Sequence, residues 1–331
     1  MFDMDLNKFK EDIFKINSTN EFNKLSLELF YFQYKHNKHY KEFVDLLGVE
    51  VKDVKSINEI PFFPIELFKE KKILCQGISY EKIFHSSGTT TDKKSKHYIE
   101  SIKFYEKSIR RSFEIEFKKI KSYSIFCLTP EYKTNNKSSL IHMCNYLIKE
   151  SGCTNSGFYY NKYEKLIEKI EISKRKNKPF IIIGLSFLLL DFAIKHKINL
   201  NGGIVLETGG MKKENVEYTK DELYEILRDR FSIKNIGSEY SMTELLSQSY
   251  SNKKGKFHSP PWKKILIRNI NNPLKIVNKN NITGGINIID LANIHSCAFI
   301  ATNDLGKKQG EYYQVLGRMN NSLIRGCNNL I

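Results

Sequence analysis

Residues 180–190 of the chain read Phe-Ile-Ile-Ile-Gly-Leu-Ser-Phe-Leu-Leu-Leu, an apolar run that ends at Asp191. A helix that spans a membrane needs about 20 apolar residues, so this run is too short to cross a bilayer. We expect a buried strand over Phe180–Gly184 that leads directly into a helix. Ile204-Val205-Leu206, closed by Gly209-Gly210, predicts another strand.

The alternation of strand and helix continues on both sides of this run. Before it we expect a helix over residues 101–121, a strand over 123–128 and a helix over 139–149. After it, Thr219 and Glu222 have capping-box spacing for a helix that extends to Arg230, and a strand is expected over 233–236. This rhythm is typical of parallel strands joined by crossover helices.

The two ends of the chain differ in character from its middle. Near the amino end, Ser18 and Glu21 predict the start of a helix that runs to Tyr34. Strands with little helix between them are expected over residues 264–270, 285–291 and 298–301. We therefore predict an α/β fold of mixed or parallel sheets with packed helices, in one domain over residues 1–331. Its successive parts are expected to be a helical region at 1–60, an α/β core at 61–250 and a β-rich, barrel-like closing subdomain at 251–331.

Composition limits the class of protein. The 331 residues are 40% hydrophobic and 27% charged, which excludes a wholly disordered or fibrous chain. The 53 Lys and Arg residues exceed the 37 Asp and Glu residues by 16, and such an excess can indicate a nucleic-acid partner. Almost all of it is Lys, however, whereas proteins that read phosphates and bases rely on Arg. We therefore predict no nucleic-acid partner.

The cysteines and the amino terminus indicate a cytoplasmic protein. The six cysteines are scattered and include no Cys-x-x-Cys pair, so neither a disulfide framework nor a zinc site is expected. Residues 1–6 lack the basic and then apolar pattern of a signal peptide. We predict a reduced, cytoplasmic location with no membrane span.

A loop rich in hydroxyl groups is the first segment with chemical potential. Ser86-Ser87-Gly88-Thr89-Thr90-Thr91 is followed by Lys93, Lys94 and Lys96. Small hydroxyl residues and a glycine let backbone N–H groups and side chains surround a phosphate. The spacing of a Walker A loop is absent, and a polar surface loop has the same composition.

Three later segments offer complementary groups. Residues 237–244 follow an expected strand and supply Tyr240 for a base, hydroxyls for a phosphate and Glu244 for a hard cation, although a helix N-terminus has similar residues. Asp304 follows another expected strand and could accept hydrogen bonds from ribose, or form an Asx-turn. Cys327 lies near Arg325, which would favour the reactive thiolate, or is an incidental cysteine.

Taken in order along the chain, these segments resemble the signature motifs of the ANL adenylate-forming superfamily. That group includes acyl-CoA synthetases, the adenylation domains of peptide synthetases and firefly luciferase. The hydroxyl loop resembles its phosphate loop, and the later segments resemble its Tyr-Gly-x-Thr-Glu, Thr-Gly-Asp and Gly-Arg hinge motifs at residues 240–244, 302–304 and 317–318. Within it the chain is most similar to the LuxE-type acyl-protein synthetases, the long-chain-fatty-acid–protein ligases of bacterial luminescence. Further stretches that carry this resemblance are Pro61–Lys69, Ser138–Ile141, Thr208–Gly210, Ser238–Gln248, Pro260–Trp262 and Arg325–Cys327.

The resemblance implies an acid–thiol ligase that uses ATP and Mg²⁺ to activate a carboxylic acid, of the fatty class, as an acyl-adenylate. Its implied nucleotide-binding residues are Ser86, Ser87, Gly88, Thr89, Thr90, Thr91, Gly209, Gly210, Glu239, Tyr240, Asp304 and Arg318. Among them, Ser86 to Thr91 would hold the phosphates, Tyr240 would stack near the adenine, and Asp304 and Arg318 would grip the ribose.

The resemblance also implies catalytic residues and a partner. Thr243 would contact the α-phosphate, and Glu244 would act in catalysis by binding Mg²⁺. Cys327 matches the near-terminal cysteine that carries the acyl group as a thioester. The acyl group would then pass to a partner reductase, which makes the aldehyde with NADPH.

The chain departs from the superfamily pattern in places. Thr91, Ser241 and Asn303 stand where the motifs have Gly, which changes backbone freedom and keeps the functional side chains. The mobile small domain that follows the hinge motif in most relatives, with its catalytic lysine, is not expected here. Lys93, Lys94, Lys96 and His97 are candidates, by position, for the replacing cation.

Two other functions stay open. A CoA-dependent ligase of the phenylacetate type would release a free thioester and would not need Cys327. An inactive adenylate-binding scaffold would bind nucleotide without releasing pyrophosphate.

Overall fold

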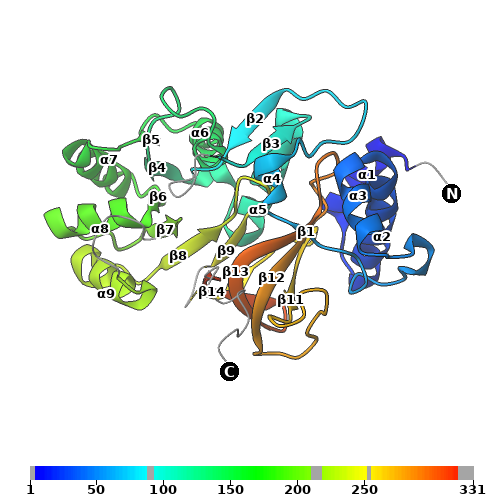
Figure 1. Ribbon diagram of the computed structural model, residues 1–331. Coiled ribbons are helices and arrows are strands. Elements are labelled where there is room, and N and C mark those ends of the chain that lie inside the picture. The colour runs from blue at the N-terminus through cyan, green and yellow to red at the C-terminus, as the bar shows by residue number, and fades with distance from the viewer. Residues whose placement is uncertain (1–3, 88–92, 210–217, 252–254, 320–331) are drawn as a thin grey trace. The chain divides into compact units, whose positions relative to one another are not determined.

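The computed structural model describes residues 4–87, 93–209, 218–251 and 255–319 (Figure 1). The chain forms two compact units, each assembled from segments that are distant in sequence. Unit 1 comprises residues 1–81, 95–100 and 258–331, and unit 2 comprises residues 82–94 and 101–257. The division at residues 60 and 250 stays a prediction, and the two units are described separately below.

Unit 2 is built on a sheet in the order β5-β4-β6-β7-β8-β9. Neighbouring strands are parallel except for β9, which runs antiparallel to β8. The bounds are β4 (Ser124–Leu128), β5 (Gly157–Phe158), β6 (Phe180–Leu185), β7 (Ile204–Thr208), β8 (Ile236–Tyr240) and β9 (Ser249–Ser251). Every residue of β4 is buried, as expected for a parallel strand covered on both faces.

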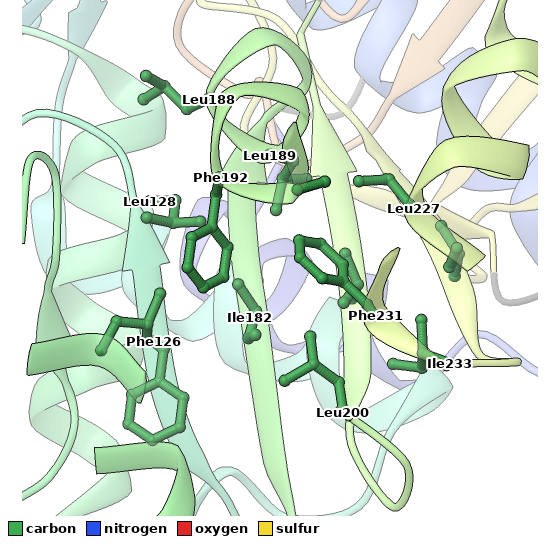
Figure 2. Close-up of a cluster of buried hydrophobic side chains, with 14 of the residues drawn as sticks. Phe126, Leu128, Ile182, Leu188, Leu189, Phe192, Leu200, Leu227, Phe231 and Ile233 are labelled. Atoms are coloured by element: carbon green, nitrogen blue, oxygen red, sulfur yellow. The ribbon is translucent and has the colours of Figure 1, made fainter. Parts of the chain in front are cut away.

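Helices cover both faces of this sheet. Their bounds are α5 (Ile102–Glu116), α6 (Ser139–Ser151), α7 (Tyr163–Arg175), α8 (Ser186–Lys195) and α9 (Lys220–Phe231), with a 3₁₀ turn at Ile120–Ser122. On one face, Phe192 of α8 and Phe231 of α9 pack with Ile182 of β6 in a continuous apolar core (Figure 2). On the other face, Phe113 of α5 contacts Tyr250 of β9, with ring centroids 6.1 Å apart.

The position of β8 corrects the sequence analysis. The strand begins at Ile236 rather than at residue 233, so Gly237 to Tyr240 lie inside the strand and not in a loop after it. Pairing with β7, from Val205 opposite Ile236 to Thr208 opposite Glu239, sets these bounds. Gly and, to a lesser degree, Glu are depleted in strands, and Gly237 and Glu239 therefore hide this strand in the sequence.

The amino-terminal part of unit 1 is helical, as predicted. Its elements are α1 (Leu6–Asp12), a 3₁₀ turn at Ile13–Lys15, α2 (Thr19–His36), α3 (Lys38–Leu46), a 3₁₀ turn at Val51–Asp53, β1 (Phe63–Pro64), α4 (Leu67–Glu70) and β3 (Lys96–Ile99). The Ser18 side chain caps α2 by accepting a hydrogen bond from the Glu21 backbone N–H at 3.2 Å.

The carboxyl-terminal part of unit 1 is an antiparallel sheet (Figure 1). Its strands are β11 (Lys263–Arg268), β12 (Thr283–Asp290), β13 (Phe299–Gln309) and β14 (Tyr312–Arg318), in that order. The short β1 adds to it in parallel, with Phe63 opposite Ile300. Two further strands are short. Strand β2 (Lys82–His85) belongs to unit 2, and β10 (Phe257–His258) lies at the boundary in sequence between unit 2 and unit 1.

The long strand β13 is the second correction. The sequence predicts a strand that ends at Ala301 and a loop that carries residues 302–304, whereas β13 continues to Gln309. Strands β12 and β14 pair with it on either side, which keeps its polar carboxyl half extended. The residues of the third motif therefore lie within a strand.

Aromatic contacts join α2 and α3 to this sheet within unit 1. Phe30 of α2 and Tyr40 of α3 contact Phe299 of β13, with ring centroids 6.2 and 5.9 Å away. The buried Gln33 side chain donates to the backbone carbonyl oxygen of Asn293 at 2.7 Å.

The arrangement confirms the predicted mixed α/β fold with packed helices and a β-rich carboxyl-terminal part. Among the residues that the structure describes, no helix is both long and apolar enough to cross a membrane.

Candidate functional site

Two of the predicted nucleotide segments of unit 2 meet at the carboxyl ends of β7 and β8. Thr208 and Glu239 lie opposite each other, and the Thr208 hydroxyl donates to a Glu239 carboxylate oxygen at 2.5 Å. Gly209 follows with φ of +77°, a conformation that glycine adopts without strain. The carboxyl edge of a parallel sheet is where ligands bind in such folds. The structure therefore brings Gly209, Glu239 and Tyr240 to one edge.

A buried carboxylate that the sequence analysis missed supports this edge. Glu207 points to the opposite face of the sheet from Thr208 and is 5% exposed. It accepts hydrogen bonds from Ser238 Oγ at 2.6 Å and Ser186 Oγ at 2.8 Å, and pairs with Lys220 Nζ at 2.7 Å. The only signal in the sequence is an acidic residue that follows an apolar strand core.

Tyr224 completes this cluster from helix α9. Its hydroxyl lies 2.5 Å from Ser238 Oγ and 3.3 Å from Glu207 Oε1. Burial, followed by the charge of Glu207, raises the pKa of Tyr224, so the phenol stays protonated. The cluster thereby ties strands β7 and β8 to helices α8 and α9.

Tyr240 lies at the last position of β8 and is partly exposed. Its ring packs beside Phe257, with centroids 5.7 Å apart. Lys220 Nζ lies 5.2 Å from the Phe257 ring centroid. An aromatic ring in this setting can stack on a planar base.

Thr243 and Glu244 follow β8 in a turn rather than in a helix. The turn is closed by the backbone N–H of Leu245, which donates to the carbonyl oxygen of Met242 at 3.0 Å. Thr243 is partly exposed, and Glu244 is 4% exposed. Within the residues that the structure describes, no three or more His, Cys, Asp or Glu side chains gather to hold a metal ion. Mg²⁺ bound with a nucleotide needs only one or two protein carboxylates, so Glu244 fits that role chemically.

The hydroxyl loop begins directly after β2. Ser86 is partly exposed and Ser87 is exposed, whereas Gly88, Thr89, Thr90 and Thr91 lie outside the described residues. His85 anchors the entry to the loop, because its backbone N–H donates to the Lys137 carbonyl oxygen at 2.8 Å. This hydrogen bond holds the residue that precedes the predicted phosphate loop.

His142 of helix α6 is buried and contacts Lys82 of β2. Its Nε2 lies 3.1 Å from Glu106 Oε1, and its Nδ1 lies 3.4 Å from Lys82 Nζ. Burial, followed by the charges of Lys82 and Lys149, lowers the pKa of His142 to about 4. The imidazole is therefore neutral at pH 7, which lets Nδ1 accept from Lys82 while Nε2 donates to Glu106.

Unit 1 brings together the two residues expected at the ribose. Asp304 of β13 lies opposite Arg318 of β14, and Arg318 Nε is 3.6 Å from Asp304 Oδ1. A register shift makes this pairing possible, because Leu316 is an extra residue between Gly317 opposite Leu305 and Val315 opposite Gly306. The Asp304 side chain is 12% exposed and that of Arg318 is 75% exposed, so the arginine extends into solvent.

The side chain of His97 is not placed to act at this site. It is 1% exposed, and its Nε2 lies 2.9 Å from Ser296 Oγ within unit 1. Such a histidine is part of the packed interior. Lys93, Lys94 and Lys96 stay as the positional candidates for a compensating cation.

The predicted acyl carrier Cys327 lies outside the described residues, as does Gly210. The thiols that the structure describes are those of Cys75, Cys127, Cys144, Cys153 and Cys297. Burial raises the pKa of Cys75 to about 12 and raises the pKa of Cys127 and Cys297 well above the ordinary value for a thiol. Cys153 is partly exposed, and its Sγ lies 3.2 Å from Ser124 Oγ, at the amino end of β4 and away from the carboxyl edge.

The sequence model of the LuxE acyl-protein synthetase family matches residues 10–331. The chain belongs to this family. The family's description is acyl-protein synthetase, so the chain is a ligase. The match extends through all the predicted motifs and includes Cys327.

Two curated relatives of this LuxE-family chain are named long-chain-fatty-acid–luciferin-component ligases. The protein from Aliivibrio fischeri is 27% identical over 340 residues, which covers 92% of this chain and 86% of the relative. The protein from Vibrio harveyi is 22% identical over 332 residues, which covers 89% and 83%.

Solved structures of adenylate-forming enzymes share the fold. A 2-hydroxyisobutyryl-CoA ligase with an acyl-AMP and CoA bound has a TM-score of 0.63 at 12% identity, over 92% of this chain and 69% of the other. O-succinylbenzoate coenzyme A synthetase from Bacillus subtilis, with AMP bound, has a TM-score of 0.50 at 14% identity. That comparison covers 73% of this chain and spans half the length of the synthetase.

Proposed function

We propose that this LuxE-family ligase activates a long-chain fatty acid with ATP as an acyl-adenylate, and then takes the acyl group onto Cys327 as a thioester. The observation that carries the proposal is the family match over residues 10–331, which includes both the nucleotide motifs and Cys327. The meeting of Thr208, Gly209 and Glu239 at one sheet edge supports a nucleotide site there.

The first step joins the acid to AMP. A carboxylate oxygen attacks the α-phosphorus of ATP, the bond from that phosphorus to the bridging oxygen breaks, and pyrophosphate leaves with the electron pair. Thr243 would hold the α-phosphate, and Ser86 and Ser87 would hold the departing phosphates. Mg²⁺, held by Glu244, would neutralise charge on the phosphate oxygens. Catalysis in such a step depends on positioning and electrostatics.

The second step transfers the acyl group to sulfur. The Cys327 thiolate attacks the acyl carbon, the carbon–oxygen bond to AMP breaks, and AMP leaves. The thiol proton passes to solvent before the attack. A thioester keeps the acyl group reactive, so a partner acyl reductase could accept it. Because the described thiols are buried or lie at the other edge of the sheet, Cys327 is the cysteine best suited to this role.

Intact-protein mass spectrometry tests this function directly. The chain is incubated with ATP, Mg²⁺ and a panel of fatty and aryl acids. We expect a mass gain equal to the acyl group, which hydroxylamine removes because it cleaves thioesters. Cys327→Ala should show no gain, whereas the matched control Cys153→Ala should be acylated like the wild type.

A second candidate function follows from the shared fold with a CoA ligase. If pyrophosphate release requires CoA and survives Cys327→Ala, the chain releases a free thioester and the proposed transfer to Cys327 is wrong. Nucleotide binding without pyrophosphate release for any acid would instead identify an inactive scaffold.

A further inference from the structure

Glu66 reaches the third motif from a distant part of the chain. It follows the two-residue strand β1, which pairs in parallel with β13 within unit 1. The backbone N–H of Ile65 extends this pairing by donating to the Ala301 carbonyl oxygen at 3.1 Å. Glu66 is thereby brought alongside the Thr302-Asn303-Asp304 segment.

Asn303 is held from two sides. Its side-chain amide donates to Glu66 Oε1. Its backbone carbonyl oxygen accepts a hydrogen bond from the Met319 N–H at 2.8 Å, directly after Arg318. A single residue thus connects the Glu66 carboxylate with both residues expected to grip the ribose.

A buried arginine forms the base of this arrangement. Arg268 is 7% exposed and donates to the Thr302 carbonyl oxygen at 2.5 Å and to Asn287 Oδ1 at 2.9 Å. Burial lowers the pKa of Arg268, and the carboxylates of Glu66 and Asp304 oppose this shift, so the cation interacts with both. Gly285 makes room for it, since a Cβ there would lie 2.5 Å from Arg268 Cζ.

We propose that Glu66 is a positioning residue for the nucleotide ribose, because it fixes Asn303 and thereby the direction in which the Asp304 carboxylate points. The inference deepens the proposed function, on which the ribose role of Asp304 rests. It also gives a reason for Asn at a position where the superfamily motif has Gly. A glycine is held by its backbone alone, whereas Asn303 adds a side-chain bond to Glu66.

Nucleotide selectivity tests this role in the full chain. Calorimetric titration measures the Kd of ATP and of 2′,3′-dideoxy-ATP for the wild type and for Glu66→Ala, Glu66→Gln and Asn303→Ala. We expect the wild type to prefer ATP by about tenfold or more, the scale of hydrogen bonds to a carboxylate. Glu66→Ala should reduce this preference to about twofold, with little change for the dideoxy nucleotide. Glu66→Gln should retain it, because the amide oxygen can still accept from Asn303.

Asn303→Ala provides an independent route to the same result, since it removes the donor without altering Glu66. It should also reduce the preference, and adding Glu66→Ala to it should cause no further loss. Glu70→Ala, at an exposed glutamate of α4, is the matched control and should behave as the wild type. An unchanged preference in Glu66→Ala, or an equal loss of affinity for both nucleotides, would overturn the proposal.

The two proposals fail in different ways. A wild-type chain that prefers ATP over the dideoxy nucleotide and yet forms no acyl-adenylate would refute the proposed function and leave the Glu66 test intact. Equal binding of both nucleotides by the wild type would refute the positioning role.

Discussion

The buried side chain of Glu207 is stabilised by hydrogen bonds and an ion pair with its neighbours. Ser186, Ser238 and Lys220 surround its carboxylate within 2.8 Å, and of these three only Ser238 lies in a stretch that carries the family resemblance. A buried carboxylate is tolerated only when it is paired and hydrogen-bonded. Sequence analysis could not find this cluster, because its members come from β7, β8, α8 and α9.

Removal of this carboxylate should therefore destabilise the protein. We expect Glu207→Ala to lower the free energy of unfolding by about 3 kcal/mol, because it leaves the buried hydroxyls and Lys220 without their acceptor. Urea unfolding followed by circular dichroism measures the change. Glu225→Ala, at an exposed glutamate of α9, should stay within about 0.5 kcal/mol of the wild type. Equal unfolding midpoints for the two variants would contradict this account.

His142 should make stability depend on pH. Its pKa of about 4 in the folded state lies below its ordinary value of 6.5, so between these values the unfolded chain binds more protons. The contribution of His142 to the free energy of unfolding is therefore fully present above pH 6.5, and it is lost as the pH decreases towards 4. At pH 5 we expect a loss of about 2 kcal/mol relative to pH 7 from this residue.

The variant His142→Gln tests this assignment. Its free energy of unfolding, measured between pH 5 and 7, should depend less on pH than that of the wild type. Some dependence should remain, because burial also lowers the pKa of His295 to about 4. The control His39→Gln changes a partly exposed histidine and should keep the wild-type slope. An undiminished slope in His142→Gln would show that the imidazole is not the group that titrates.

At the scale of elements, β8 shows what an apolar pattern can and cannot predict. Strands β4, β6 and β7 each contain a run of three or more apolar residues, and the sequence located each of them. Strand β8 carries Gly237, Ser238 and Glu239 instead. Ser238 and Glu239 make hydrogen bonds to β7, and Gly237 lets β9 pair at close range. Strand β13 was predicted too short for a similar reason, since its second half is polar and is held by β12 and β14.

Gly237 is the position in β8 where this close approach is critical. A Cβ atom there would lie 2.0 Å from the backbone carbonyl oxygen of Ser251 in β9. We expect Gly237→Ala to lower the free energy of unfolding by about 1–3 kcal/mol and to weaken ATP binding, because the same strand carries Glu239 and Tyr240. Chemical unfolding and calorimetric titration measure the two effects. Gly157→Ala is the control, since its nearest contact would be an ordinary 3.5 Å, and equal behaviour of the two variants would refute the steric argument.

At the scale of the whole molecule, the order of motifs was more informative than any local pattern. The sequence predicted the α/β class and the family. The structure places Thr208 beside Glu239 and Asp304 beside Arg318, and their role at a nucleotide stays a prediction. It could not predict that Glu66 accepts a hydrogen bond from Asn303, because the two residues lie 237 positions apart. The roles of all the predicted site residues stay predictions, including those of Cys327 and of residues 88–91.

The discontinuity of unit 1 affects how the chain folds during synthesis. Helices α2 and α3 present Phe30 and Tyr40 to Phe299, and Gln33 to Asn293, so their partners leave the ribosome some 250 residues later. At about 5–20 residues per second, this delay is on the order of ten to fifty seconds. Unit 2 can assemble in that interval from residues already synthesised. During this interval the apolar faces of α2 and α3 remain uncovered. Chaperones can therefore bind these two helices in the nascent chain.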